Sequence, residues 1–180
     1  MLSVPSKISA RAKTISKIAL GSANFGCDYG LANHAGKVSN TELEKILSLS
    51  KEVGIEVIDT AQAYGDSESR IGTLCGDGRF KIVTKIGVDL ERNFKTDTIN
   101  SFVKQSCKRL NQSHIFAVLV HRPEALLGGN GRKIIKELLT IKEERVVSKI
   151  GISVYSPLIL GEISKLMQLD IVQAPFNIFD

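Results

Sequence analysis

The chain of 180 residues contains no tryptophan, only four prolines and only three cysteines. The cysteines are Cys27, Cys75 and Cys107. Their odd number argues against a disulfide framework, and their spacing lacks the paired pattern of zinc ligands. Each is therefore expected to be a small buried or half-buried residue rather than a nucleophile. A reducing, cytoplasmic setting fits this cysteine usage best.

Long hydrophobic runs are also missing. The longest, at residues 115–120, is the size of a strand and falls far short of the roughly 18 residues that a membrane-spanning helix needs. We therefore expect a soluble protein without a membrane partner. The hydrophobic content of 43% supplies one core, and 180 residues are too few for two ordinary domains, so one domain is expected over residues 17–180.

Clustered positive charge is absent as well. The formal net charge of +5 comes from Lys and Arg spread along the chain, without the basic and aromatic interleaving of nucleic-acid surfaces, so no nucleic-acid partner is expected. A mildly basic balance suits a pocket for an anionic dinucleotide as well as it suits a solvated surface. Residues 1–16 contain three basic residues and no acid, and are expected to form a flexible basic tail rather than a transit peptide.

Short β-branched apolar runs alternate with longer amphipathic segments, a pattern typical of βαβ units and a parallel sheet. Six strands are predicted, at residues 17–20, 56–59, 80–85, 115–121, 149–154 and 170–174. Helices are predicted over residues 41–54 with Ser39 or Asn40 as cap, from Thr96 or Asp97 to Leu110, over 132–144 and from Pro157, with a weaker helix after Asp66.

Right-handed crossovers between parallel strands leave two architectures, an open doubly wound sheet or a closed barrel. The doubly wound sheet would need a G-x-G-x-x-G turn after the first strand, but the chain reads GSANFGCDYG after Leu20. The predicted fold class is therefore α/β, a parallel (β/α)8 TIM-type barrel. Such a barrel needs eight strands and about 250 residues. We expect an incomplete barrel of six units, whose exposed sheet edges could support self-association.

Polar residues lie at or near the carboxyl ends of five of the predicted strands. They are Asp59, Lys85, His121, Ser153 and Gln173. The working residues of parallel barrels lie at this carboxyl end, and Tyr64 follows Asp59 by five residues on the adjoining loop. In the alternative interpretation, Asp59 and Lys85 form only a buried structural ion pair, Tyr64 is a loop aromatic and His121 is a satisfied histidine before a turn.

These residues resemble the aldo-keto reductase family. The match comprises the Asp and Tyr of IDTAQAYG, the Lys of IVTKIG and the His of LVHRP, in the order of the family. Further similarity lies in LGSANFG, IGISVYSP and VQAPFNIFD, so that it extends from about Lys17 to the last residue. The resemblance implies an NAD(P)H-dependent oxidoreductase that reduces a small aldehyde or ketone, such as a sugar derivative, to an alcohol.

The resemblance also implies residues for the cofactor. Ser153 and Gln173 would hold the nicotinamide carboxamide. Gly21 is a further cofactor-binding candidate, and so is Asn177, for which a plain role in the loop after the sixth strand is the alternative. This sequence departs from one common family form at Val154, where that form has Asn. NADP(H) is preferred by family habit, with NAD(H) as the alternative, and no metal site is expected.

Carbonyl reduction places negative charge on oxygen as hydride arrives at carbon, so a proton donor must stand beside that oxygen. Tyr64 is the candidate acid. Lowering its pKa by about three units from about 10 needs roughly 4 kcal/mol. One ammonium about 4 Å away, at an effective dielectric constant near 20, supplies about that much. We expect Lys85 to be this ammonium, Asp59 to hold it in place, and His121 to orient the substrate oxygen.

Six units would leave out the last two, which in the resembled family grip the phosphates of the cofactor. Three hypotheses therefore remain. The chain is a reductase whose missing units come from a longer gene product or another chain, or a non-enzymatic cofactor-sensing or interaction protein on the same fold, or an inactive truncated remnant. The chain alone is expected to be unstable or poorly active.

Overall fold

Six parallel strands follow one another across a single sheet in the computed structural model, which describes residues 17–31, 33–76, 78–87, 90, 94–95 and 97–178. They are β1 (Leu20–Gly21), β2 (Val57–Asp59), β3 (Lys81–Ile86), β4 (Ile115–Val120), β5 (Val147–Ser153) and β6 (Ile171–Gln173). Each strand pairs in parallel with the next along the chain, and the order never reverses among the described strands. This topology confirms the incomplete barrel, since a doubly wound sheet would reverse its order.

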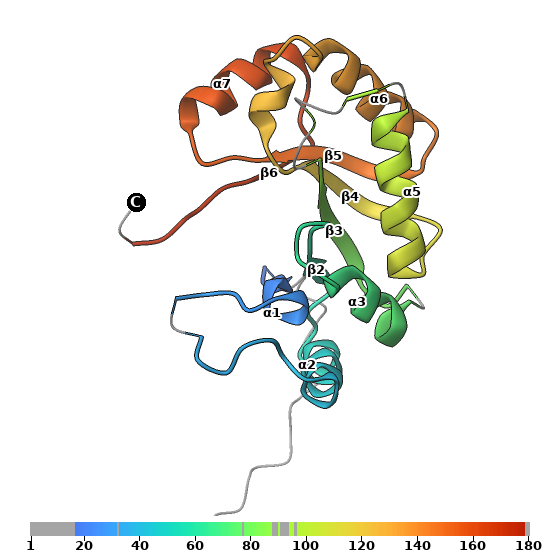
Figure 1. The fold of residues 1–180 in the computed structure, drawn as a ribbon, viewed down its shortest axis with the longest axis vertical. Helices are drawn as coiled ribbons and strands as arrows, with labels where there is room; N and C mark the ends of the chain where they lie inside the picture. Colours follow the sequence, from blue (N-terminus) through green and yellow to red (C-terminus); the bar gives the residue numbers. More distant parts are fainter. Residues whose placement is uncertain are drawn as a thin grey trace, which may run out of the picture.

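The described helices are α1 (Ala23–Gly26), α2 (Asn40–Glu52), α3 (Ser67–Cys75), α5 (Thr98–Leu110), η1 (Pro123–Leu126, a 3-10 helix), α6 (Gly131–Glu143) and α7 (Pro157–Leu166). The short α1 borders the pocket at the carboxyl ends of the strands, and the longer helices lie outside the sheet. Figure 1 shows α3, α5, α6 and α7 succeeding one another around the outside of the strands. No helix in the described part of the chain is long and apolar enough to cross a membrane.

Most helix starts agree with the sequence signals. The Ser39 side chain caps α2 by accepting a hydrogen bond from the backbone of Glu42 at 3.2 Å. Ser156 and Pro157 open α7 in the predicted order. The weaker helix after Asp66 is α3.

The prediction was less accurate in three places. The first strand begins at Leu20 rather than at residue 17, because only Leu20 and Gly21 pair with β2. The short helices α1 and η1 were not foreseen. At the start of α5, Asp97 is the N-cap residue but its own side chain makes no capping bond. Glu137 of α6 accepts from the backbone of Asp97 and Ile99 instead, at 2.8 and 2.9 Å.

Two predictions concern residues beyond the described ranges. The tail expected over residues 1–16 and Thr96, the alternative start of α5, both lie outside the described residues.

The strands separate two apolar layers. The larger lies between the sheet and its helices, and includes Ile82 and Ile86 of β3. The smaller lies on the inner face, where Val83 of β3 packs with Ala117 and Leu119 of β4. Because side chains alternate along a strand, Lys85 shares the inner face with Val83. The inner layer is thus apolar in its middle and charged toward the carboxyl ends of the strands.

Among the described strands, each edge strand of the sheet is paired on one side only. β1 bonds to β2, and β6 bonds to β5. Val172 on β6 and Phe176 and Ile178 just beyond it are exposed. Figure 1 shows the chain leaving β6 and running away from the sheet. The described strands therefore form an open arc.

Gly72 allows the backbones of α3 and α5 to touch. A Cβ atom there would overlap the carbonyl oxygen of Arg109 and lie 2.6 Å from the carbonyl carbon of Leu110. Gly72→Ala should therefore lower the free energy of unfolding by roughly 1–3 kcal/mol. Gly161 in α7 has open space around it, so Gly161→Ala should raise stability by about 0.5–1 kcal/mol. Urea unfolding measures both, and a tolerated Gly72→Ala would contradict this helix contact.

Candidate active site

A pocket of about 370 Å³ opens at the carboxyl ends of the strands. Seven of the eight residues that the sequence analysis selected line it: Gly21, Asp59, Tyr64, Lys85, His121, Ser153 and Gln173. The eighth, Asn177, is exposed on the segment after β6 and is not among the lining residues. Its assignment to the cofactor stays a prediction.

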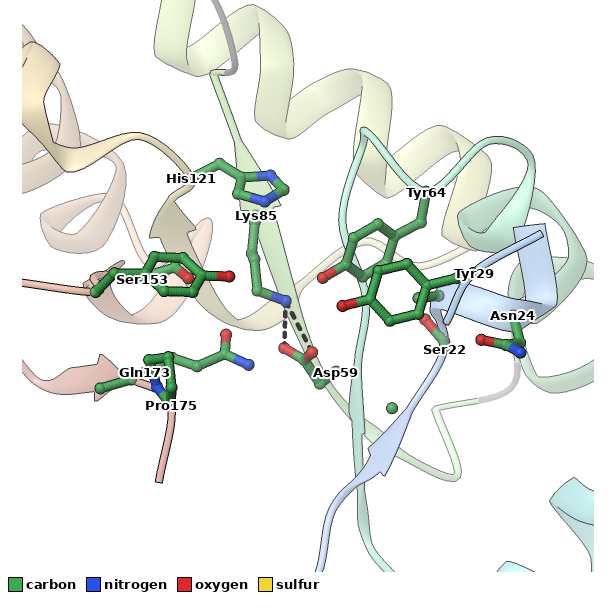
Figure 2. Close-up of a pocket in the computed structure, with 14 residues that line it drawn as sticks. Ser22, Asn24, Tyr29, Asp59, Tyr64, Lys85, His121, Ser153, Gln173 and Pro175 are labelled. Atoms are coloured by element: carbon green, nitrogen blue, oxygen red, sulfur yellow. Dashed lines mark hydrogen bonds and ion pairs between the residues drawn. The ribbon is translucent and has the colours of Figure 1, made fainter. Parts of the chain in front are cut away.

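Parallel register explains why residues so distant in sequence meet. Gly21 lies opposite Asp59 in the β1–β2 pair, and Ser153 lies opposite Gln173 in the β5–β6 pair. Asp59 lies opposite Val83, which is on the same face of β3 as Lys85 and two residues before it. All these side chains therefore lie at the carboxyl edge of the sheet, where they surround one space. Figure 2 shows Ser153 and Gln173 on one side of this space and Tyr64 on the other, with Lys85 and Asp59 between them.

Lys85 and Asp59 form the central contact of the pocket. The Lys85 Nζ donates to Asp59 Oδ1 at 2.7 Å, to Oδ2 at 2.8 Å and to the carbonyl oxygen of Thr60 at 3.2 Å. The Lys85 side chain is only 2% exposed and that of Asp59 is 20% exposed. Burial lowers the pKa of Lys85, while the carboxylate of Asp59 acts in the opposite direction.

Tyr64 stands on a tight turn between β2 and α3. Its backbone nitrogen donates to the carbonyl oxygen of Ala61 at 3.0 Å. Gly26 and Gly65 bring α1 against this turn, since a Cβ on either would overlap the backbone of the other segment. The ammonium of Lys85 lies 5.0 Å from the centroid of the Tyr64 ring. The ring of His121 meets that of Tyr64 edge to face, with 6.0 Å between the centroids.

The pKa of Tyr64 moves opposite to the expectation from the sequence. Burial, followed by the negative charge of Asp59, raises the pKa of Tyr64 to about 12. The predicted lowering by Lys85 was wrong for this structure. Because Asp59 pairs with the ammonium through both oxygens, little net positive charge remains to favour a phenolate. The phenol therefore keeps its proton at neutral pH and can donate it in a hydrogen bond.

His121 follows β4 and is half-buried. Burial, followed by the positive charges of Lys85 and Arg122, lowers its pKa, so the neutral imidazole is favoured. Its Nδ1 atom is buried without a hydrogen-bond partner among the described residues. A buried N–H without an acceptor is costlier than an unpaired acceptor, which favours the tautomer with the proton on Nε2.

Ser153 and Gln173 form the opposite wall. The Ser153 residue is 8% exposed. The Oε1 atom of Gln173 is buried without a partner among the described residues. An unpaired buried acceptor costs free energy unless a ligand donates to it. No group of three or more His, Cys, Asp or Glu in the described residues could hold a metal ion.

Four further polar lining residues were not selected from the sequence. They are Ser22, Asn24, Tyr29 and Tyr155. Ser22, Tyr29 and Tyr155 lie in the loops after the first and fifth strands, and Asn24 lies in the short helix α1 of the first connection. The rule that βα connections surround the mouth of a barrel could have drawn attention to them. Figure 2 shows Tyr29 beside Tyr64. Single loop residues carry no periodic signal, so the sequence alone did not rank them.

The fold and the site together define an enzyme-like parallel barrel, with an ion pair, a phenol and an imidazole at the carboxyl ends of its strands. Comparison with family models makes this specific, because residues 17–180 match the model described as "Aldo/keto reductase family". The chain belongs to the aldo/keto reductase family.

Individual relatives are distant. D-arabinose 1-dehydrogenase of Saccharomyces cerevisiae is 29% identical over 151 residues, which cover 79% of this chain and 44% of that one. The methylglyoxal reductase DkgB of Salmonella typhi is 28% identical over 107 residues, which cover 57% of this chain and 39% of that one. The chain thus spans less than half the length of these curated relatives.

Solved structures agree on the fold. An aldo-keto reductase structure from Pseudomonas aeruginosa superposes with a TM-score of 0.75 at 28% identity, covering 92% of this chain and 65% of that one. The Bombyx mori aldo-keto reductase, solved with NADP, has a TM-score of 0.69 at 19% identity, and the match covers 89% of this chain and 54% of that one. At that identity the likeness concerns the fold alone.

The buried phenol can be titrated directly, because the chain has three tyrosines and no tryptophan. In a variant with Tyr29→Phe and Tyr155→Phe, Tyr64 is the single tyrosine. Its absorbance should still titrate above about 10, because burial and the charge of Asp59, the two largest causes of its raised pKa, are unchanged. An unfolded tyrosine titrates near about 10. The folded pKa is raised, so the contribution of Tyr64 to stability is fully present below about pH 10 and lost as pH rises toward 12. A midpoint at or below about 10, with circular dichroism still native, would contradict this environment.

Proposed function

We propose that this chain carries the carbonyl-reducing site of an NAD(P)H-dependent aldo-keto reductase, with Tyr64 as the general acid. The observation that carries the proposal is the arrangement around one pocket of the Lys85–Asp59 ion pair, the Tyr64 ring 5.0 Å from the ammonium, and His121 edge-on to Tyr64. Oxidoreductases among its relatives support the reaction class.

The pocket suits a nicotinamide on one wall. The buried Oε1 of Gln173 lacks a donor, and the amide hydrogens of a carboxamide would supply one. Ser153 lies across the strand pair from Gln173 and would offer its hydroxyl to the same group. Gly21 borders the pocket without side-chain bulk, and a Cβ there would meet open space. The cofactor, when bound, would supply the hydride.

Each residue of the cluster then has a distinct role. The Tyr64 hydroxyl donates its proton to the carbonyl oxygen as negative charge develops there. An alkoxide is a stronger base than a phenolate, so this transfer is downhill even with a raised pKa. The Lys85 ammonium, which lies 5.0 Å from the centroid of the Tyr64 ring, would hold the ring in position, and the phenolate would regain its proton from water. His121 as the neutral Nε2 tautomer would hold the oxygen in place.

A polar carbonyl compound such as a keto-sugar is the proposed substrate class. Asn24, Ser22 and the phenols of Tyr29 and Tyr155 place hydrogen-bonding groups around the same mouth. A relative named for D-arabinose is consistent with this polar lining. NADP(H) is proposed over NAD(H), since two structural neighbours were solved with NADP.

Two substitutions separate binding from chemistry. Tyr64→Phe should keep NADPH binding, which is measured by NADPH fluorescence. It should lower the turnover of nitrobenzaldehyde or of a keto-sugar by a factor of roughly 100 or more. Gln173→Leu keeps the side-chain volume but removes the carboxamide acceptor, and should weaken NADPH binding itself. A Tyr64→Phe variant as active as the parent, or a Gln173→Leu variant that binds NADPH as tightly as the parent, would contradict the proposed site.

We also propose that the open sheet edge next to β6 makes the chain self-associate. Val172 at this edge is 42% exposed, and Phe176 and Ile178 are almost fully exposed beside it. Val172→Lys should therefore reduce the concentration-dependent mass in sedimentation velocity, since an edge lysine opposes strand pairing. Leu49 on α2 is 59% exposed and remote from β6 in sequence, and Leu49→Lys serves as the matched control. Equal effects of the two variants, or none, would overturn the proposal.

A further inference from the structure

Glu68 is a carboxylate that lies outside the pocket and is almost completely buried. Glu68, in the first turn of α3, is 2% exposed. Its Oε1 accepts from the hydroxyl of Thr84 on β3 at 2.6 Å, and its Oε2 accepts from Nε of Arg109 on α5 at 2.6 Å. One side chain thus ties a helix to the strand beneath it and to the neighbouring helix.

Such an arrangement is poorly explained by stability alone. Taking a carboxylate out of water is costly, and an apolar side chain of similar size often stabilises a protein as well or better. Arg109 is still 33% exposed, so it compensates the buried charge only in part. What the ion pair adds is geometry, because two charge-assisted hydrogen bonds fix the helix against β3 and α5 in one position.

A second set of contacts holds the same loop from its other end. Gln62 donates through Nε2 to the backbone oxygen of Phe102 and to the hydroxyl of Ser106, both at 2.9 Å. Its backbone nitrogen donates to the carbonyl oxygen of Lys85 at 3.0 Å. Arg109 completes the connection by donating to Ser106 at 3.4 Å. The segment from Gln62 to Glu68 is therefore anchored to α5 at both ends.

Tyr64 lies between these two anchors, and Lys85 directly follows Thr84. Because side chains alternate along β3, Thr84 faces Glu68 on the helix side while Lys85 faces the pocket. A shift of α3 against β3 would thus change the distance between the Tyr64 ring and the Lys85 ammonium, which is 5.0 Å here.

We propose that Glu68 is a positioning residue that, through Thr84 and Arg109, holds Tyr64 against the Lys85–Asp59 pair. The inference rests on the proposed function, because it assigns the network to the reacting phenol. Glu68 touches neither the pocket nor any reacting atom. It acts by setting where the Tyr64 turn sits.

The test uses the full chain in the Tyr29→Phe, Tyr155→Phe background, where Tyr64 is the single tyrosine. Glu68→Gln keeps the shape but points an amide N–H at Thr84 or Arg109, and Thr84→Val removes one donor without touching charge. In both variants the pKa of Tyr64 should fall from its raised value in this background toward about 10, as the turn opens to water. In the NADPH assay on the otherwise unchanged chain, kcat should fall roughly tenfold or more, with KM for the carbonyl nearly unchanged.

Asp170→Asn is the matched control. Asp170, 18% exposed, accepts from Lys142 at 2.6 Å and from the backbone of Ile150 at 3.0 Å, so it ties α6 to the β5–β6 region by an equivalent ion pair. This variant should lower Tm but leave the titration of Tyr64 in place. If Asp170→Asn moves that titration as much as Glu68→Gln does, general loosening explains the effect and the proposal is overturned.

The outcomes remain distinguishable. If Glu68→Gln and Thr84→Val lower Tm but leave the pKa of Tyr64 unchanged, Glu68 has only a structural role and the proposal is overturned. If Glu68→Gln fails to fold, the nearly isosteric Thr84→Val decides. A Tyr64→Phe variant as active as the parent would contradict the proposed function, whereas the titration decides the positioning role without turnover.

Discussion

The buried ion pair of Lys85 and Asp59 is the constraint on which the pocket depends. An ammonium that is 2% exposed needs its hydrogen bonds satisfied inside the protein, and both carboxylate oxygens of Asp59 and the carbonyl of Thr60 satisfy them. These partners come from β2 and the residue that follows it, so β2 and β3 must keep their register. Any slip of one residue would turn Lys85 toward the helices.

The electrostatics of the pocket follow from the same pair. With the ammonium balanced by a carboxylate, the site as a whole disfavours new charge, and the pKa shifts of Tyr64 and His121 both favour their neutral forms. A neutral donor pair beside a paired cation suits a reaction in which charge appears only briefly on a bound oxygen. The same balance would make the pocket a poor binder of anions placed near Asp59.

Close contacts also fix the loops at the mouth of the pocket. Ser67 donates to the carbonyl oxygen of Ser22 at 3.0 Å, and α1 presses on the Tyr64 turn where only glycines fit, at Gly26 and Gly65. The first and second βα connections therefore form one support, with Glu68 anchoring it from behind. On the far side, β6 has no such support, since its outer edge is unpaired among the described strands.

The sequence by itself determined the architecture and the principal side chains, because these depend on short-range patterns. Strand period placed β2 to β6 within a few residues, and a polar residue at the end of a buried strand marked Asp59, Lys85, His121, Ser153 and Gln173. Tertiary structure alone decided how these groups behave. The capping of α5 by Glu137, the burial of Glu68 and the direction of the Tyr64 pKa each result from residues brought together from distant elements. The burial of a side chain and the charge around it depend on all its neighbours in space. The spacing of residues along the chain does not show which neighbours these are.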